Sequence, residues 1–89
     1  MFEWDENKRL RNLEKHNLDF KDVALLFDVR PTVTETAVSS DEMRHMTTAA
    51  MNDGKFYTVI WTWRESNRRI ISFRRARNVE KRTYREIFG

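Results

Sequence analysis

The spacing of hydrophobic residues changes from helical to alternating at the single proline of the chain. Before the proline, Leu10 and Leu13 recur at helical spacing in a charged segment, and this predicts a helix that buries a narrow apolar stripe. Asp5 stands where an N-cap belongs, and the helix runs to about His16. Asn17 suits a left-handed residue that ends it.

Two further helices are predicted by the same kind of signal. Asp19 suits the N-cap of a short second helix, which Arg30-Pro31 ends because the residue before proline avoids the helical region. Its apolar residues are Phe20, Val23, Ala24, Leu26 and Phe27. Asn78 suits the cap of a final helix that ends near Phe88. The apolar positions of this helix are sparse: Val79, Tyr84, Ile87 and Phe88.

Alternating side chains predict strands between these helices. Residues 56–64 and 68–75 give the strongest patterns, and residues 32–38 are β-branched and alternating. Residues 43–51 suit a strand, although their alanines and methionines suit a helix equally. Asn52-Asp53-Gly54-Lys55 predicts a hairpin turn with positive φ at the glycine. With a short strand at residues 1–4, the order is strand, two helices, an antiparallel meander of three to four strands and a C-terminal helix. This is one α+β domain over residues 1–89.

The two strongest strands predict what each face of the sheet carries. If residues 65–67 form a three-residue loop, Arg64 pairs with Arg68, and one face becomes an apolar core of Tyr57, Val59, Trp61, Trp63, Ile71 and Phe73. The other face becomes a half-polar groove of Thr58, Thr62 and Ser72, with Arg64 and Arg74 at its opposite ends. A two-residue loop at residues 66–67 would pair Arg64 with Arg69 and mix the two sets. Because Trp61 and Trp63 lie on the apolar face, we expect them in the core rather than stacked on bases.

Composition narrows the class of protein. The chain has 89 residues, of which 39% are hydrophobic and 35% charged, and this excludes a fully disordered tail. We expect no membrane helix, since no apolar run approaches about 20 residues. Acidic residues at Glu3, Asp5 and Glu6 argue against a signal peptide. The absence of cysteine excludes disulfides and thiolate metal sites, and it fits a cytoplasmic protein.

Charge is divided unevenly along the chain. The first 53 residues carry 7 basic and 11 acidic residues, whereas the last 36 carry 10 basic and 3 acidic. Such asymmetry suggests a polyanionic partner for the C-terminal part. A solvated charged surface would explain it equally well.

Several segments match, in order, the motifs of one known family. The opening carries Phe2-Glu3-Trp4-Asp5, Lys8, Asn12, Lys15-His16 and Phe20. The centre has Glu42-Met43-Arg44 and Thr62-Trp63-Arg64. The tail has Arg69-Ile70-Ile71-Ser72-Phe73-Arg74, Ala76, Glu80-Lys81-Arg82 and Tyr84. Together they resemble the BrnT family, which are toxins of type II toxin–antitoxin pairs. Asn17 replaces the family's usual glycine, and residues 43–51 lack its aromatic-rich pattern around Arg44 and His45.

The resemblance implies a RelE-like fold and a ribonuclease that inhibits translation and arrests growth. It also implies a complex with a cognate BrnA-type antitoxin, in a higher-order assembly that binds operator DNA through the antitoxin. Two other functions stay open: a non-catalytic nucleic-acid-binding module, and a protein-interaction module with a basic face.

RNA cleavage by 2′-OH attack needs a base, an acid and cations near the phosphoryl oxygens. Arg64 and Arg74 match the family's T-x-R and S-x-R positions, but ion pairing with Glu65 or Glu80 would also explain them. Lys8 and His16 lie in one row with Asn12 along the first helix and complete the predicted catalytic set. His16 suits acid–base chemistry by its ordinary pKa, although a histidine at a helix C-terminus also stabilises the helix dipole. Asn12 suits a structural brace.

The remaining basic residues are expected to bind RNA. This set is Arg69, Arg75, Lys81, Arg82 and Arg85, with Tyr84 as a stacking residue or proton donor, or as a packing residue of the last helix. We expect no metal and no cofactor, because two distant histidines and scattered carboxylates offer no metal-ligand spacing.

Overall fold

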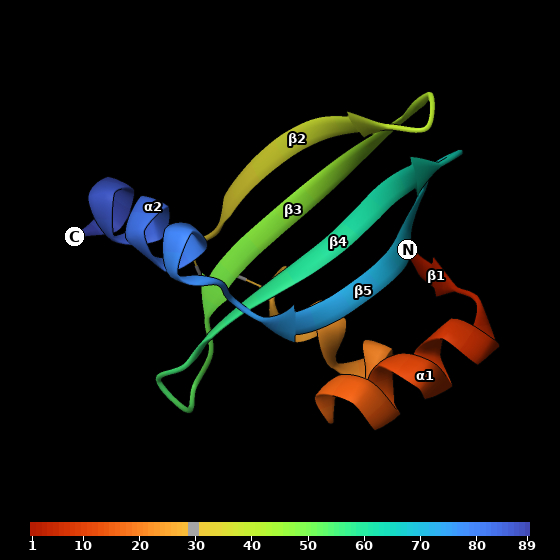
Figure 1. The fold of residues 1–89 in the computed structure, drawn as a ribbon, viewed down its shortest axis with the longest axis horizontal. Helices are drawn as coiled ribbons and strands as arrows, with labels where there is room; N and C mark the ends of the chain where they lie inside the picture. Colours follow the sequence, from red (N-terminus) through yellow and green to blue (C-terminus); the bar gives the residue numbers. More distant parts are fainter. Residues whose placement is uncertain (29–30) are drawn as a thin grey trace.

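A single sheet organises the part of the chain that the structure, a computed structural model, describes: residues 1–28 and 31–89 (Figure 1). Its strands are β1 (Phe2–Trp4), β2 (Val33–Ser39), β3 (Glu42–Ala50), β4 (Phe56–Arg64) and β5 (Asn67–Arg75). They lie in the order β1-β5-β4-β3-β2, with β1 parallel to β5 and the other neighbours antiparallel. The predicted α+β class is confirmed, and of the predicted segment 43–51 residues 43–50 belong to a strand while Met51 lies beyond its end.

The helices lie on both sides of this sheet. Helix α1 (Glu6–His16) runs beside β5, a 3₁₀ helix η1 (Phe20–Leu25) crosses the sheet, and α2 (Asn78–Phe88) lies at one end of it. No described helix is long and apolar enough to cross a membrane. The predicted stop at Arg30-Pro31 involves Arg30, which is outside the described residues.

Local sequence signals set the ends of the first elements. The Asp5 carboxylate accepts hydrogen bonds from the backbone N–H groups of Asn7 and Lys8, and it therefore caps α1 as predicted. Asn17 has a φ of 56° and ends the helix in the left-handed region. Gly54 has a φ of 79° in the turn between β3 and β4, where a residue with a side chain would be strained.

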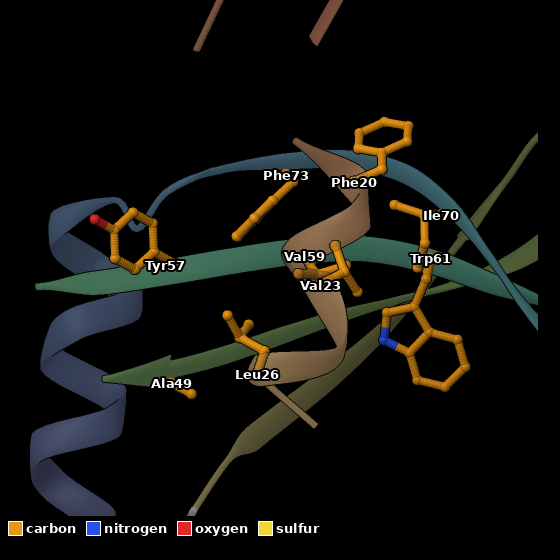
Figure 2. Packing of buried hydrophobic residues seen from close by; sticks show 9 residues of the cluster. All are labelled: Phe20, Val23, Leu26, Ala49, Tyr57, Val59, Trp61, Ile70 and Phe73. Carbon is orange, nitrogen blue, oxygen red and sulfur yellow. The ribbon is translucent and has the colours of Figure 1, made fainter. Parts of the chain in front are cut away.

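The hydrophobic core lies between η1 and one face of the sheet, which we call the core face. Figure 2 shows η1 crossing the strands, with Phe20 beside β5, Val23 beside Val59 of β4 and Leu26 beside Ala49 of β3. The sheet contributes Ala49, Tyr57, Val59, Trp61, Ile70 and Phe73. Full burial of a side chain such as Phe20 or Leu26 stabilises the fold by roughly 1.5–3 kcal/mol. These few residues therefore hold η1 against the sheet.

The predicted apolar stripe of α1 is only partly buried, because Leu13 is half-buried and Leu10 is not. Leu10 is 49% exposed, and the buried residue of the helix is Asn12. Strand β1 pairs with β5 only up to Ile70, so the edge of β5 beyond that residue has backbone groups without a strand partner. The side chain of Asn12 hydrogen-bonds the N–H and C=O of Phe73 there. Backbone N–H and C=O groups at a buried strand edge need hydrogen-bond partners, which an asparagine side chain supplies and a leucine side chain does not.

The predicted register of the β4–β5 hairpin is also wrong. Its loop is the two residues Glu65 and Ser66, so Arg64 pairs with Asn67 and Trp63 with Arg68. A bulge then leaves Ile71 between the partners of Trp61 and Ile60, and Ile70 takes the core position that was predicted for Ile71. Beyond the bulge the faces agree with the prediction. Ser72 and Arg74 lie with Arg64 on the second face, which we call the groove face.

Two smaller predictions differ from the structure. Trp63 is 50% exposed rather than part of the core, because the packed residues of η1 reach Trp61 and not the end of the hairpin. The N-cap of α2 is Arg77 rather than Asn78, and the backbone N–H of Arg77 donates to the Glu80 carboxylate. Helix α2 rests on the groove face through an edge-to-face contact between Tyr84 and Phe56.

Candidate active site

A depression of about 310 Å³ lies between α1 and β5, where the groove face meets the helix. The sheet side is Ile71 and Ser72. The helix side is Lys8, Arg11, Asn12, Lys15 and His16, which recur at helical spacing and share one stripe of α1. The residues lining this depression include no carboxylate, so the stripe presents uncompensated positive charge.

Asn12 fixes the helix at the base of this depression. Its side-chain amide donates to the carbonyl oxygens of Phe73 at 2.8 Å and Leu18 at 3.0 Å. Its side-chain oxygen accepts from the Phe73 backbone N–H at 3.1 Å. The amide therefore takes the place of a neighbouring strand and sets the height of Lys8 and His16 above β5. This is the structural role expected of it.

His16 is the titratable group at the C-terminal end of the stripe. Partial burial, followed by the charges of Lys15 and Arg74, lowers the pKa of His16 below its usual 6.5. The imidazole is consequently neutral at neutral pH and able to accept a proton. A neighbouring guanidinium and ammonium would also repel the imidazolium once it formed, which favours rapid return of the proton.

Lys8, Arg11 and Lys15 lack anionic partners within residues 1–28 and 31–89. None of them forms an ion pair there, and Arg11 Nε donates a 3.4 Å hydrogen bond to the Asn7 carbonyl. An anion entering the depression would therefore not have to displace a carboxylate first.

Arg74, predicted as a catalytic cation, is held by Glu80. It is only 9% exposed, and its two terminal nitrogens each donate to one carboxylate oxygen at 2.9 Å. A third hydrogen bond runs to the carbonyl of Arg75 at 3.2 Å. This bidentate geometry fixes Arg74 between β5 and α2, as the alternative interpretation of the sequence allowed.

Glu80 connects this ion pair to the sheet. Burial alone would raise the pKa of Glu80, but hydrogen bonds from Arg74, the Arg77 backbone and Thr58 lower it to about 2. Thr58 bonds in turn to Thr48 at 2.8 Å. The carboxylate is thus charged throughout the physiological range and anchors α2 to β3 and β4.

Two other arginines predicted as site residues lie on the groove face, in ion pairs that are more exposed to solvent than that of Arg74. Arg69 lies 2.8 Å from Glu3 of β1, and Arg64 lies 3.5 Å from Glu42 of β3. The side chain of Arg64 is 55% exposed, so water screens this contact strongly. Both residues are at the hairpin end of the sheet, and neither lines the depression on α1.

The remaining predicted RNA-binding residues lie elsewhere. Lys81, Arg82 and Arg85 line a shallow hollow of about 460 Å³ on α2, together with Asn78 and Glu86. Arg75 stacks on Tyr57 at 5.5 Å, on the core face. Tyr84 packs between Phe56 and Phe88, and its hydroxyl donates to the Pro31 carbonyl at 3.3 Å.

Two residues of the depression, Arg11 and Lys15, were not predicted as site residues, although Lys15 belongs to the family motif. The signal was present, since each lies three residues after a predicted member of the row or directly before His16. His45 stacks on Trp61 at 4.5 Å and lies outside the depression. In the part of the chain that the structure describes, no three His, Cys, Asp or Glu side chains are grouped to hold a metal ion.

Comparison with known proteins identifies the family. Residues 4–80 match the family model described as the ribonuclease toxin BrnT of type II toxin–antitoxin systems. This chain belongs to the BrnT family. It is accordingly a ribonuclease toxin of a type II system, and a system of that type includes an antitoxin partner.

A solved structure supports the family assignment. The crystal structure of the ribonuclease toxin BrnT from Brucella abortus is similar to this chain with a TM-score of 0.64 and 28% identity. The match covers 88% of this chain and 99% of that one. A comparison with curated proteins gives no match.

Proposed function

We propose that this BrnT-family chain is an endoribonuclease that cuts RNA without a metal ion, in the depression between α1 and β5. The observation that carries the proposal is the meeting of a neutral histidine, His16, with three uncompensated cations over one hollow. This combination supplies a base and positive charge for the phosphoryl group.

In the proposed reaction the 2′-oxygen of a ribose attacks the adjacent phosphorus, and the bond to the 5′-oxygen breaks. The proton of the 2′-OH passes to Nδ1 or Nε2 of His16, and the leaving 5′-oxygen takes a proton from water or from Lys8. The products are a 2′,3′-cyclic phosphate and a 5′-OH end. Arg11 and Lys15, together with Lys8, offset the charge that builds up on the phosphoryl oxygens.

The two predicted catalytic arginines take different parts in this proposal. Arg74 acts at a distance: its charge contributes to the lowered pKa of His16 while its fork stays on Glu80. Arg64, with Arg69, Arg75 and the hollow of Lys81, Arg82 and Arg85, would contact the phosphates of the RNA outside the depression. Tyr84 serves mainly to pack α2.

The toxin is proposed to act in the cytoplasm, to inhibit translation by cutting RNA, and to be neutralised by a BrnA-type antitoxin. The absence of cysteine is compatible with that compartment. The complex is proposed to be a higher-order assembly that binds operator DNA through the antitoxin. Size-exclusion chromatography with light scattering, and operator binding by complex and toxin separately, test this part.

The catalytic proposal is tested by cleavage of a single-stranded RNA by the purified protein with and without EDTA. We expect equal rates in both, and a loss of about 10²- to 10⁴-fold in His16→Asn, the range for removal of a general base. His45→Asn is the matched control and should cut at the wild-type rate. Intact RNA with retained binding would instead assign a non-catalytic RNA-binding module, and absence of RNA binding at low salt would assign a protein-interaction module.

A further inference from the structure

Trp63 and Arg68 form a second exposed feature, on the core face at the hairpin end of the sheet. They are direct cross-strand partners in β4 and β5, so their side chains lie on the same face. Trp63 meets Trp61 edge-to-face at 86°, with ring centroids 5.1 Å apart, and half of its surface is open to solvent. The exposed half of the indole is therefore available to contact another molecule.

The guanidinium of Arg68 is enclosed by aromatic rings. Its central carbon lies 4.7 Å from the ring centroid of Phe27, 5.0 Å from those of Trp61 and Trp63, and 5.9 Å from that of Phe2. Within the described residues it forms no ion pair, and its buried Nε has no hydrogen-bond partner. Every other arginine that the structure places on β4 or β5 contacts a carboxylate or a single ring, so Arg68 is the exception among them.

This arrangement fits a nucleotide with an unstacked base. A guanidinium held flat by rings keeps its N–H groups in the plane of the fork, and a phosphate accepts two of them at once. A half-exposed indole beside it offers a face for a base, which is how single-stranded RNA is held by proteins. A base in a duplex is already stacked on its neighbours and is not free for this contact.

We propose that Trp63 and Arg68 form a subsite for an unpaired nucleotide of the RNA substrate, the indole stacking on the base and the guanidinium holding its phosphate. This inference rests on the proposed ribonuclease function and narrows its substrate class to single-stranded RNA. RNA is favoured over an acidic protein segment because the exposed indole of Trp63 lies beside the guanidinium, and a base stacks on such a ring whereas a carboxylate side chain does not.

Fluorescence anisotropy with a labelled 2′-O-methyl RNA strand tests the subsite, because the modified strand is bound without being cut. Trp63→Ala should weaken binding of this single strand by about 5- to 100-fold and leave binding of the matching duplex unchanged. Trp63→Phe, which retains a ring, should recover most of the affinity. Met43→Ala is the matched control, since Met43 is similarly exposed at 55% on the neighbouring strand and carries no proposed role.

Wild-type affinity in Trp63→Ala would overturn the subsite and would instead indicate a protein-docking face. An equal loss of affinity in Met43→Ala would also overturn it, by indicating a folding defect common to both variants. Thermal unfolding of each variant separates these two outcomes. Failure of catalysis is read separately: Trp63-dependent binding of the modified strand, with ordinary RNA left intact, would retain the subsite and reject the ribonuclease proposal.

Discussion

The cations of α1 and the arginines of the groove face differ in what surrounds them. Lys8, Arg11 and Lys15 border a hollow that no carboxylate lines. Each arginine of the groove face lies against a glutamate: Arg64 at 3.5 Å, Arg69 at 2.8 Å and Arg74 at 2.9 Å. A paired cation must leave its partner before it binds a phosphate. The α1 row is therefore the more available set, although it contains fewer arginines.

This difference shows that residue type alone does not identify a phosphate-binding cation. A guanidinium matches a phosphate and a carboxylate with the same fork, so a sequence motif containing arginine is consistent with either partner. In this fold the connection from β5 to α2 brings Glu80 onto Arg74, so the partner of Arg74 is a carboxylate. Lysines and a histidine on one helical stripe have no such partner nearby, and they form the centre of the proposed site.

The largest expected effect is on the free energy of unfolding, and it separates Arg74 from Arg64, which the sequence predicted to share a catalytic role. Arg74→Met should lower the free energy of unfolding by about 3 kcal/mol, because it leaves the Glu80 carboxylate largely buried without its partner. Arg64→Met should lower it by about 0.5 kcal/mol or less, since its pair is exposed. Urea unfolding of both variants measures the difference, and equal losses would contradict the contrast.

The second-largest expected effect is the loss of the Glu80–Arg74 ion pair in acid. The pKa of Glu80 is about 2 in the folded chain and 4.5 ordinarily, so the folded state binds protons less readily than the unfolded state. The stabilisation is complete above pH 4.5 and is lost as the pH falls towards 2. Urea unfolding from pH 7 to 2.5 should therefore give curves for wild type and Glu80→Gln that converge as the pH falls. Parallel curves would contradict this assignment, and the comparison removes the contribution of the other carboxylates, which both proteins share.

The smallest expected effect concerns the acid–base group itself. Lys15→Gln should raise the pKa of His16, because it removes one of the two positive charges that lower it. The acid limb of the cleavage profile should move to higher pH in parallel, since cleavage requires the neutral imidazole. Arg64→Gln should leave both unchanged. NMR titration of the imidazole protons reports the pKa directly, with His45 as an internal reference, and a shift in the opposite direction would rule out this electrostatic coupling.

Much of the fold follows from local signals in the sequence. Asp5, Asn17 and Gly54 mark element ends by backbone chemistry that acts within a few residues, and alternation identifies β4 and β5. The bulge at Ile71 is different. Two adjacent isoleucines satisfy a core position equally well, so the pattern does not say which one faces inward, and one extra residue reverses the faces along half of β5.

The site was predictable to the extent that it lies on one helix. Lys8 and His16 were predicted from their spacing along α1 together with their match to the family motif. The pairing of Arg74 with Glu80, by contrast, depends on how α2 folds back onto the sheet. The ring cage of Arg68 is still less local, because Phe2, Phe27 and Trp63 come from three distant segments. No sequence window contains that environment.

Because they have no carboxylate partner, the cations of α1 should contribute more to RNA binding than the paired arginines of the sheet. The most direct test is the salt dependence of binding to a 2′-O-methyl RNA strand in two charge-matched variants. One carries Lys8→Gln and Lys15→Gln, and the other carries Arg64→Gln and Arg69→Gln. The first should reduce the magnitude of the slope of log K against log salt by about 1.4, as expected for two lost phosphate contacts, and the second should reduce it by less. The reverse pattern would contradict the account.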